Sequence, residues 1–546
     1  MINDIKKKVA IDEVSKTLIS KEDQTKSGIV RFVTFNVNAV RTLFQYQPFS
    51  HMRESLSQVF DYLDGDIITF QELKIEKSVV GKWGQVDGFQ SFISIPTLKK
   101  GYSGVGCWVR QYQVGHPLHE AMKVVKAEEG ITGYLSVKVN KTSTLRYRDD
   151  PTIGIGGYHD ILSEEEAIEI DSQGRCVIVE LGCGLVVFST YCPANSQRSE
   201  DGEIYRMKFL KVLFGRIRNL EKVGKNVVLM GDLNICRDLM DSAELLEDLK
   251  ISTANGVKGT DIDVKHLTEC HNFIVNPDTP HRKILNHLIT DSLVSDCSKD
   301  GVLIDSTRYK QGRDRLKMYT VWNTQKNTRP SNYGSRVDFI LVSDKWKDKI
   351  QDADILPNVM GSDHCPMYTD VVIPKSLIET LPQYDDRIPR FEARYKYDLL
   401  NHNILSMFSK GSNRKILSPS PSSQPTFGIQ KKRSASKSNS IDSFFTKSKS
   451  VEIKKESSSV ASYYLTKSKI LKEGSRPKSA SNGTVVKQKM LFKEAFGKPP
   501  TCKHGEDAIL KTSRTSNHPG KKFWTCSRSR GSSDDKESSC GFFQWV

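Results

Sequence analysis

The sequence predicts a large α/β or α+β domain with stacked β-sheets, followed by a basic tail. Between residues 30 and 372, strand-like runs such as GVGCWVR and NVVLMGDL alternate with helix-like stretches. Residues 401–546 hold 28 Lys and Arg against 10 Asp and Glu, whereas residues 1–400 hold 53 against 55. A chain of 546 residues also exceeds the roughly 250–300 residues at which a single core stops growing. We therefore expect several domains.

Shifts in composition divide the chain into four segments. We predict a flexible extension over residues 1–28, a large folded domain over 29–400, a disordered basic linker over 401–498 and a small module over 499–546. The linker is dominated by Ser, Lys, Asn and Pro, so it has too few apolar groups to offset the entropy of ordering. Its positive charge suits a polyanion such as DNA, although such a tail can also serve solubility alone.

The longest helix-like stretch, residues 202–223, carries apolar residues near the helical period. This pattern predicts a stripe that packs against a sheet. The stripe comprises Ile204, Met207, Leu210, Val212, Leu213 and Ile217.

Eleven cysteines occur in a chain whose start, MINDIKKKVAIDEV, does not resemble a secretory signal. We therefore expect reduced thiols, with Cys107, Cys176, Cys183 and Cys192 as small core residues. No segment approaches the roughly 18 apolar residues of a membrane span. The expectation is a soluble intracellular protein that does not bind membranes.

Polar residues stand where strand-like runs stop. The runs IVRFVTF, DIITF and KNVVLMG each end at or just before such a residue, so several strand ends can gather polar side chains at one edge. Carboxylate and amide oxygens are hard ligands that suit Mg²⁺ or Mn²⁺ better than zinc. This arrangement predicts a metal-dependent phosphodiesterase. The residues are Asn36, Glu72, Asp232, Asn234, Asp363 and His364.

Phosphodiester cleavage also needs an activated water and stabilisation of the charge that develops on the phosphate. Asp338 can orient His364, Asp232 can hold or deprotonate the water, and Asn234 can bond the phosphate. Tyr191 is a further donor for developing charge. Taken singly, each residue has an ordinary alternative: Asp-x-Asn as an Asx turn, Ser-Asp-His as a turn or helix cap, Glu72 as a surface acid. Their joint occurrence at strand ends favours a site.

Seven motifs carry a resemblance to a known family. In order they are FNVNAVR, FQELK, GYSGVG, YCPAN, GDLNICRD, SRVDFILVS and GSDHCP. Over residues 30–373 the chain resembles the exonuclease III type of abasic-site endonuclease, within the endonuclease/exonuclease/phosphatase superfamily. It is most similar to the second eukaryotic branch, the class II enzymes of fungi.

This resemblance implies a four-layer α/β sandwich of two stacked β-sheets flanked by helices, which makes residues 29–400 a catalytic domain. It implies a Mg²⁺ site, with Mn²⁺ as a second possible ion, at Asn36, Glu72, Asp232, Asn234, Asp363 and His364. It also implies Tyr191 and Asp232 as catalytic groups, Asn234 as transition-state stabiliser and Asp338 paired with His364. Whether Asp232 or His364 acts as the main base is left open.

The chain departs from the family pattern in two places. Many relatives have Asp where this chain has Asn38, which predicts weaker metal affinity or a changed ion preference. Val321 and Ser335 replace bulky aromatic residues in the segment that lines the pocket for the extruded abasic sugar. We therefore expect weaker incision at internal abasic sites and stronger processing of 3′ ends.

The C-terminal module contains four soft or borderline ligands, enough for a closed tetrahedral zinc site. Free cysteines beside a surface histidine are the alternative. NHPGKKFWTC and CGFFQWV resemble the GRF-type zinc finger over residues 499–546, which implies binding of single-stranded DNA. Lys521 and Lys522, where the family has Arg-x, are the expected DNA contacts. The predicted zinc ligands are Cys502, His504, Cys526 and Cys540.

The linker contains two short apolar islands. Ile441, Phe444 and Phe445 resemble the peptide that binds the sliding clamp, proliferating cell nuclear antigen, although Ser438 stands where Gln is usual. A second island with Tyr463 and Tyr464 repeats the spacing more weakly.

The sequence therefore predicts a monomeric nuclear repair enzyme that acts on double-stranded DNA with abasic sites or 3′-blocked ends. It would hydrolyse the phosphodiester 5′ to an abasic site and remove 3′-blocking groups and 3′ nucleotides. The alternatives are a phosphatase of the same superfamily and a damage-site scaffold without catalysis. A mitochondrial fraction is left open.

Overall fold

The computed structural model describes residues 28–399, except 98, 141 and 198, and residues 500–512, 521–526, 528 and 539–545. The first range lies in one compact unit and the others in a second. The predicted boundaries of the four segments stay predictions. Ile441, Phe444, Phe445 and the second aromatic island lie outside the described residues.

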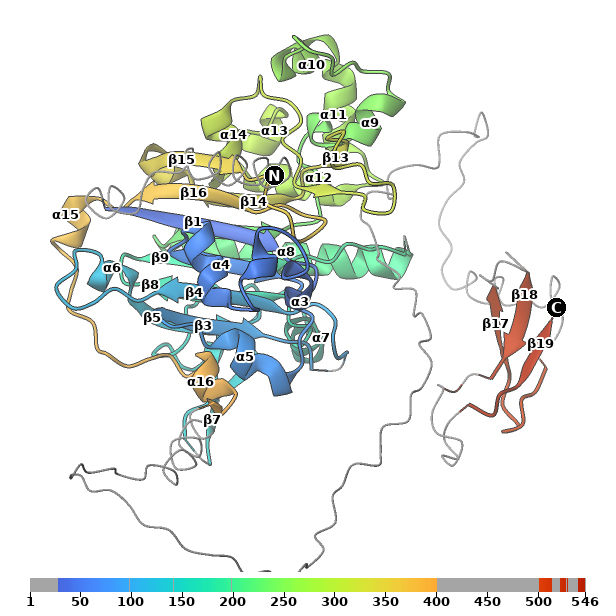
Figure 1. Cartoon of the computed structure of the whole chain (residues 1–546), viewed down its shortest axis with the longest axis horizontal. Helices are drawn as coiled ribbons and strands as arrows, with labels where there is room; N and C mark the ends of the chain where they lie inside the picture. Colours follow the sequence, from blue (N-terminus) through green and yellow to red (C-terminus); the bar gives the residue numbers. More distant parts are fainter. Residues whose placement is uncertain are drawn as a thin grey trace, which may run out of the picture. The chain divides into compact units, whose positions relative to one another are not determined.

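Two six-stranded β-sheets form the larger unit (Figure 1). The first sheet has the order β15 (Ile350–Ile355), β16 (Met367–Val372), β1 (Ile29–Asn36), β2 (Ile67–Gln71), β4 (Val105–Arg110) and β3 (Phe89–Ser94). The second sheet has the order β11 (Leu303–Asp305), β14 (Asp338–Ser343), β10 (Asn226–Asp232), β9 (Leu185–Tyr191), β8 (Cys176–Leu181) and β5 (Val124–Glu129).

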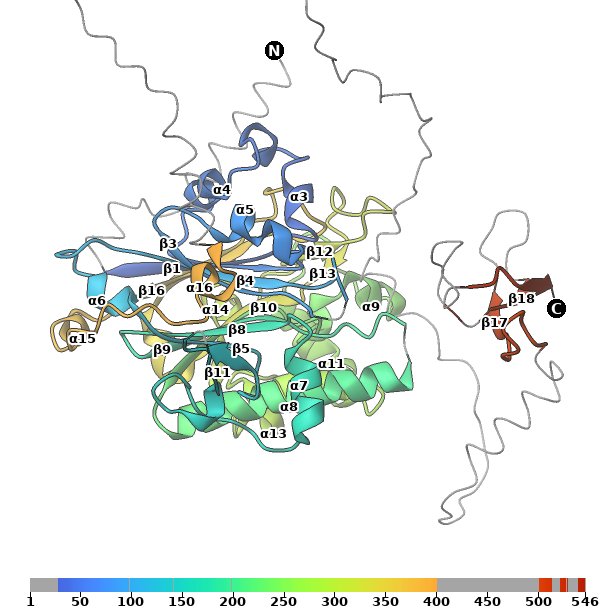
Figure 2. The same ribbon diagram turned by 90° about the horizontal axis from the view of Figure 1, so that it is seen from below.

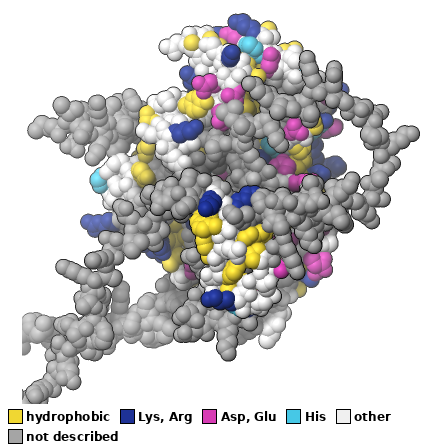
Figure 3. Space-filling view, turned by 90° about the vertical axis from the view of Figure 1, so that its right-hand side faces the viewer, with side chains coloured by type: hydrophobic (Ala, Val, Ile, Leu, Met, Phe, Trp, Pro, Cys, Tyr) yellow, Lys and Arg dark blue, Asp and Glu magenta, His cyan; other side chains and the backbone are white. Residues whose placement is uncertain are grey.

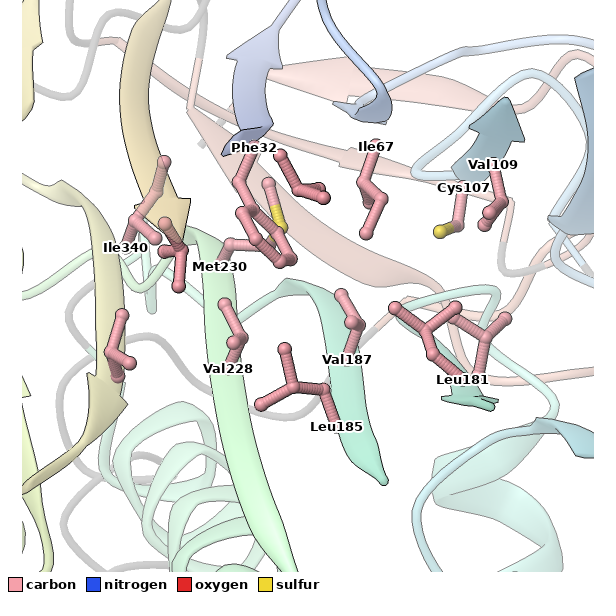
Figure 4. Close-up of a cluster of buried hydrophobic side chains, with 14 of the residues drawn as sticks. Phe32, Ile67, Cys107, Val109, Leu181, Leu185, Val187, Val228, Met230 and Ile340 are labelled. Atoms are coloured by element: carbon pink, nitrogen blue, oxygen red, sulfur yellow. The ribbon is translucent and has the colours of Figure 1, made fainter. Parts of the chain in front are cut away.

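The central strands are apolar on both faces, because each sheet is covered on both sides. In β10, Val228 and Met230 point into the core between the sheets, whereas Val227 and Leu229 point toward the helices outside. Figure 4 shows Phe32 and other side chains of the first sheet facing those of the second across this inner core. The predicted stacking of sheets is confirmed.

Helices cover the two outer faces (Figure 2). On the first sheet these are α3 (Val40–Leu43), α4 (Leu56–Leu63), α5 (Val80–Gly84) and α16 (Ala393–Lys396). On the second sheet they are α7 (Glu164–Asp171), α8 (Glu200–Lys222) and α12 (Pro280–Leu288). The four-layer sandwich is therefore confirmed.

Most of the apolar stripe predicted over residues 202–223 packs on the second sheet as part of α8. Leu210, Leu213 and Ile217 are buried, and Met207 is partly buried against them. The expectation for Ile204 was wrong, since this side chain is 50% exposed in the second turn of α8. Ile204 fits the helical period of the apolar residues, but it does not pack on the second sheet.

A set of short elements completes the larger unit. Helices α9, α10, α11 and α13 and strand β12 share a small core of their own. The elements are α6 (His119–Met122), β6 (Ser136–Lys138), β7 (Thr144–Arg146), α9 (Ala243–Asp248), α10 (Gly259–Lys265), α11 (Leu267–Val275), α13 (Ser295–Ser298), α14 (Ser306–Gln311), β12 (Val321–Trp322), β13 (Gly334–Ser335) and α15 (Lys375–Ile378).

The second unit is a three-stranded antiparallel sheet in the order β17 (Ile509–Thr512), β18 (Lys522–Thr525) and β19 (Phe543–Trp545). Across both units all eleven cysteines are free, and the four predicted core cysteines are buried. The described residues contain no helix that is both long and apolar enough to cross a membrane.

Strand register brings the predicted site residues to one edge of the sandwich. In the first sheet, Asn36 lies opposite Gln71 in the parallel pair of β1 and β2. In the second sheet, Asp232 lies between Tyr191 on parallel β9 and Asp338 on antiparallel β14. The ends of five strands therefore supply the site.

Candidate functional site

Asn36 joins the acidic groups of the two sheets. It is the last residue of β1, and its Nδ2 donates to Oε1 of Glu72 at 2.9 Å and to Oδ2 of Asp232 at 2.9 Å. Glu72 follows β2 in the first sheet, whereas Asp232 ends β10 in the second. One buried amide therefore holds carboxylates from both sheets.

Asp232 and Asn234 form a tight polar turn at the end of β10. Oδ1 of Asp232 accepts the backbone N–H of Asn234 at 2.8 Å, and Nδ2 of Asn234 donates to the carbonyl of Cys192 at 2.9 Å. The backbone of Asn234 is left-handed, with φ of 53°. Its buried Oδ1 has no hydrogen-bond partner among the described residues, as an oxygen kept for a ligand would be. The Asx turn that was the alternative interpretation of Asp-x-Asn is therefore itself part of the site.

Asp338 and His364 form a buried pair beside Asp232. Oδ2 of Asp338 lies 2.8 Å from Nδ1 of His364, and both side chains are 1% exposed. The hydroxyl of Thr320 accepts the backbone N–H of Asp338 at 3.2 Å and so fixes the start of β14. Ligand atoms of Asp232, Asp338 and His364 lie within 4.8 Å of one another. The predicted pairing is present in the structure.

Burial and close charges shift the ionisation of this cluster. Burial and the neighbouring Asp338 raise the pKa of Asp232 to about 8. Burial opposes the charge on His364, but Asp338 overcomes it and raises the pKa of the imidazole to about 10. Without metal, His364 is therefore a cation at neutral pH.

Lys74 links the remaining acids at the more open side of the site. Its Nζ lies 2.8 Å from Oε2 of Glu72 and also donates to Oδ1 of Asn38. Nδ2 of Asn38 donates in turn to Oδ1 of Asp363 at 2.9 Å. Burial opposes ionisation of Glu72, but Lys74 and Asn36 lower its pKa overall. Sequence reasoning missed Lys74, although it stands in the FQELK motif.

Tyr191 lies buried next to Asp232 across the β9–β10 pair. Burial, followed by the negative charge of Glu72, raises its pKa well above the usual value, against the effect of Arg175. The guanidinium of Arg175 lies over the tyrosine ring, 4.9 Å from its centre, and donates to the Tyr191 carbonyl at 3.2 Å. The phenol therefore keeps its proton and can donate a hydrogen bond.

Beneath the site, a buried ion network ties together two segments that follow the strand ends. The guanidinium of Arg336 makes hydrogen bonds to both carboxylate oxygens of Asp241, at 2.9 and 3.0 Å, and to Asp305 at 2.7 Å. Arg237 shares Asp305 at 2.9 Å. Arg336 precedes Asp338 by two residues, so this network anchors the segment that enters the site. It also escaped sequence reasoning.

Val321 and Ser335 face each other in the β12–β13 pair. They are 1% and 7% exposed, and Val321 packs with Leu239 in the core of the α9–α13 segment. Their suggested role in lining a sugar pocket stays a prediction.

The donor set fits a hard divalent cation. Carboxylate and amide oxygens dominate it, and the partnerless buried oxygens of Asn234 and Asp338 point to a missing positive partner. Glu72 is more exposed than Asp232 and Asp363, with 16% of its side chain accessible to solvent. Hydrogen bonds connect all six predicted metal ligands. Asn36 binds Glu72 and Asp232, Asp232 binds Asn234, Lys74 and Asn38 continue from Glu72 to Asp363, and the Ser362 hydroxyl joins Asp363 to the backbone of His364.

The four predicted zinc ligands also come together. Ligand atoms of Cys502, His504, Cys526 and Cys540 lie within 4.8 Å of one another, and Sγ of Cys526 is 3.5 Å from Nδ1 of His504. Desolvation opposes ionisation of Cys526, but backbone N–H groups of Arg528 and Cys540 lower its pKa to about 6. A thiolate at this position is what a zinc ion requires.

The aromatic residues of the finger divide between core and surface. Trp524 is buried, whereas Phe543 is 52% exposed and packs 4.8 Å from Phe523 and 5.0 Å from Trp545, measured between ring centres. Nζ of Lys521 lies 5.0 Å from the centre of the Trp545 ring. Figure 3 shows one face of the molecule, on which hydrophobic side chains are flanked by Lys and Arg.

Comparison with known families agrees with this architecture. Residues 33–364 match the Endonuclease/Exonuclease/phosphatase family, and residues 500–546 match the GRF zinc finger. The chain therefore belongs to the Endonuclease/Exonuclease/phosphatase family and ends in a GRF-type zinc finger module.

Individual relatives narrow the comparison. The DNA-(apurinic or apyrimidinic site) endonuclease 2 of Saccharomyces cerevisiae is 53% identical over 527 residues, covering 96% of this chain and 98% of that protein. The protein of the same name from Schizosaccharomyces pombe is 35% identical over 344 residues, covering 63% of this chain and 58% of its own. Among crystal structures, the Xenopus laevis APE2 catalytic domain aligns with a TM-score of 0.49 at 23% identity, covering 67% of this chain and 97% of that one. The resemblance found in the sequence is confirmed.

The pKa values predict how stability depends on pH without divalent metal. His364 holds a proton that the unfolded chain releases near pH 6.5, so its contribution should decline as the pH rises from about 6.5 to about 10. The contribution of Asp232 to stability should also decline as the pH rises toward 8. Urea unfolding at several pH values should show this decline. Asp338→Asn removes the main cause of the raised pKa of His364 and, after burial, the next cause for Asp232, so an equally steep decline in that variant would contradict the assignment.

Zinc content tests the finger. Cys526→Ser should lower bound zinc from about one ion per chain to well below one, because a closed site needs four ligands. Metal analysis of purified full-length protein measures this directly. Cys183→Ala, which changes a buried cysteine outside the cluster, should keep its zinc. Equal zinc content in both variants would refute the ligand set.

Proposed function

We propose that this protein is a DNA-repair hydrolase that cleaves the phosphodiester 5′ to abasic sites. We propose further that it removes 3′-blocking groups and 3′-terminal nucleotides, using Mg²⁺ or Mn²⁺. The observation that carries the proposal is the buried cluster in which Asn36 joins Glu72 and Asp232 beside the Asp338–His364 pair. The relatives named endonuclease 2 support DNA with abasic sites as the substrate.

Metal binding would involve the six oxygen- and nitrogen-bearing residues at the strand ends. A bound divalent ion neutralises charge on the phosphate and lowers the pKa of a coordinated water. Glu72 and Asp363 suit this role best, because their carboxylates lie at the more open side and are held by Lys74 and Asn38. The full set is Asn36, Glu72, Asp232, Asn234, Asp363 and His364.

The remaining groups suit the hydrolytic step. Water attacks phosphorus, the bond to the 3′ oxygen breaks, and the released oxygen takes up a proton. Asp232 is the better candidate to accept the proton of the water, because the positive charge of a bound cation would lower its raised pKa and leave it as a carboxylate. His364 is held as a cation by Asp338, so it favours binding of a phosphate oxygen. The protonated Tyr191 would donate to the developing charge, and Asn234 is proposed as the further stabiliser of the transition state.

The substrate preference is proposed to lie toward 3′ ends. Val321 and Ser335 are small where relatives of this family carry aromatic side chains, and both are nearly buried. A wall without aromatic rings offers little stacking to an extruded sugar, so it should select abasic sites less strongly. A 3′ terminus needs no extrusion, so its processing should suffer less from the missing stacking than incision at an abasic site.

The tail would connect this chemistry to its DNA partners. Exposed Lys521 next to the ring of Trp545, with Lys522 beside it, supports contact with single-stranded DNA through charge and stacking. The island with Ile441, Phe444 and Phe445 is proposed to bind the sliding clamp. We propose that the protein is a monomer in the nucleus, where DNA and the sliding clamp are both present.

Cleavage assays with Asp232→Asn test the proposed reaction. With Mg²⁺, the wild type should nick an abasic duplex and shorten a 3′-recessed or 3′-blocked duplex, and the 3′ reactions should be faster on matched substrates. Asp232→Asn should reduce all rates by about 10²–10⁴-fold, because it removes the proton acceptor. Asp87→Asn changes an exposed acid and should leave rates unchanged.

Other results would favour the alternatives. Release of phosphate from a soluble inositol phosphate, without DNA cleavage, would indicate a phosphatase of the same superfamily. Tight DNA binding without cleavage would indicate a scaffold. Faster incision than 3′ processing would contradict the proposed preference.

Asn38→Asp tests the effect of the missing negative charge. The variant should reach half-maximal activity at about fivefold lower Mg²⁺ concentration, because one added charge about 4 Å away contributes about 1 kcal/mol even in water. Mg²⁺ and Mn²⁺ titrations of cleavage measure this. Asn140→Asp adds the same charge at an exposed site and serves as the control. Titration curves identical to wild type would reject the role of Asn38.

A further inference from the structure

Arg329 lies in the loop between β12 and β13, and its guanidinium donates to four backbone carbonyls. Nη1 donates to the carbonyls of Ser362 at 3.0 Å and His364 at 3.2 Å. Nη2 donates to those of Pro357 at 2.9 Å and Val359 at 2.8 Å. No carboxylate within the described part of the chain forms an ion pair with it, and its buried Nε has no partner there.

The plane of the guanidinium is held by Trp322. The guanidinium carbon lies 4.4 Å from the centre of the Trp322 ring, and this side chain is 2% exposed. Nε1 of Trp322 donates to Oδ1 of Asn332 at 3.1 Å, which fixes the ring in its turn. Stacking against a locked ring orients the two terminal nitrogens toward the loop that carries Asp363.

The loop from 357 to 364 has few other attachments to the hairpin. The backbone N–H of Trp322 donates to the Asp363 carbonyl at 3.0 Å, and the N–H of Cys365 donates to the Thr320 carbonyl at 2.9 Å. These bonds hold one edge of the loop. On the other side, the guanidinium of Arg329 donates to carbonyls before and after Asp363. One side chain therefore holds both parts of the loop.

We propose that Arg329 is a positioning residue for the hydrolytic reaction. By fixing the carbonyls around Asp363, it holds the Asp363 carboxylate near Asn38 and the His364 imidazole against Asp338. This inference rests on the function proposed above. The guanidinium carries two pairs of donors in a rigid fork, whereas a lysine is a single point charge that cannot serve both pairs at once.

A purely structural role predicts a different outcome from a positioning role. If Arg329 only stabilises the fold, its replacement lowers the melting temperature and leaves the folded enzyme unchanged. If it positions the loop, the folded variant binds metal more weakly and turns over more slowly. Substrate binding changes little, because Arg329 holds the backbone behind the site.

The test compares full-length wild type with Arg329→Lys and Arg329→Ala. Mn²⁺ binding by electron paramagnetic resonance should weaken by about tenfold, since a supporting group for a metal ligand is lost. On an abasic duplex, kcat should fall by about tenfold or more with KM nearly constant. Low-millimolar guanidinium ion should restore part of kcat to Arg329→Ala. Arg387→Ala, whose side chain is 87% exposed, is the control.

The outcomes separate the two proposals. Wild-type Mn²⁺ affinity and kcat in Arg329→Lys, or a lowered melting temperature alone, would overturn the role of Arg329. Should Arg329→Ala fail to fold, Arg329→Lys decides by the same measurements. If the wild type binds Mn²⁺ but cleaves none of the DNA substrates, the proposed function fails. The Mn²⁺ affinities of the variants still decide whether Arg329 positions the loop.

Discussion

The hydrogen bonds from the Asn36 amide to Glu72 and Asp232 are the contact on which the site depends. Apolar packing between two sheets supplies buried area, but it places no polar group at a defined position at their edge. An amide that donates to two carboxyl oxygens, one on each sheet, has a defined geometry, and its bond to the ionised Glu72 is charge-assisted. The sheets are therefore aligned at the edge where the chemistry takes place.

Electrostatic compensation explains how so many charged groups remain buried there. The site holds Asp232, Asp338 and His364 with almost no exposure, and a second layer below it pairs Arg336 with Asp241 and Asp305. Removing one partner from such a pair leaves an uncompensated buried charge, which is strongly destabilising. The second layer thus resists movement of the segment that leads into β14. It gives the site a rigid support without itself taking part in the reaction.

The sequence allowed prediction of the layers and of the strand-end residues, because both follow from local patterns. Apolar runs that stop at Asn36 or Asp232 identify strand and site together. Arg329 could not be found in this way, since its partners are backbone carbonyls that carry no sequence signal. Lys74 was missed for another reason: its bond to Asn38 joins two strand ends 36 residues apart, and the FQELK motif alone does not indicate that contact. The prediction for Ile204 was wrong for the opposite reason. This residue fits the helical period of the apolar stripe, but the surface that the stripe packs on ends before it.

The two-sided burial of β10 has a consequence for how the chain tolerates insertions and deletions. In a sheet with one wet face, a one-residue slip exposes apolar groups and is rejected by stability. In β10 a slip would exchange Val228 and Met230 with Val227 and Leu229, so both cores would still receive apolar side chains. It would also put a side chain at the position of Gly231, where a Cβ would lie 2.0 Å from the carbonyl oxygen of Thr190. The slip would turn Asp232 away from its partners. In this strand the apolar pattern alone does not fix the register; Gly231 and the polar partners of Asp232 do.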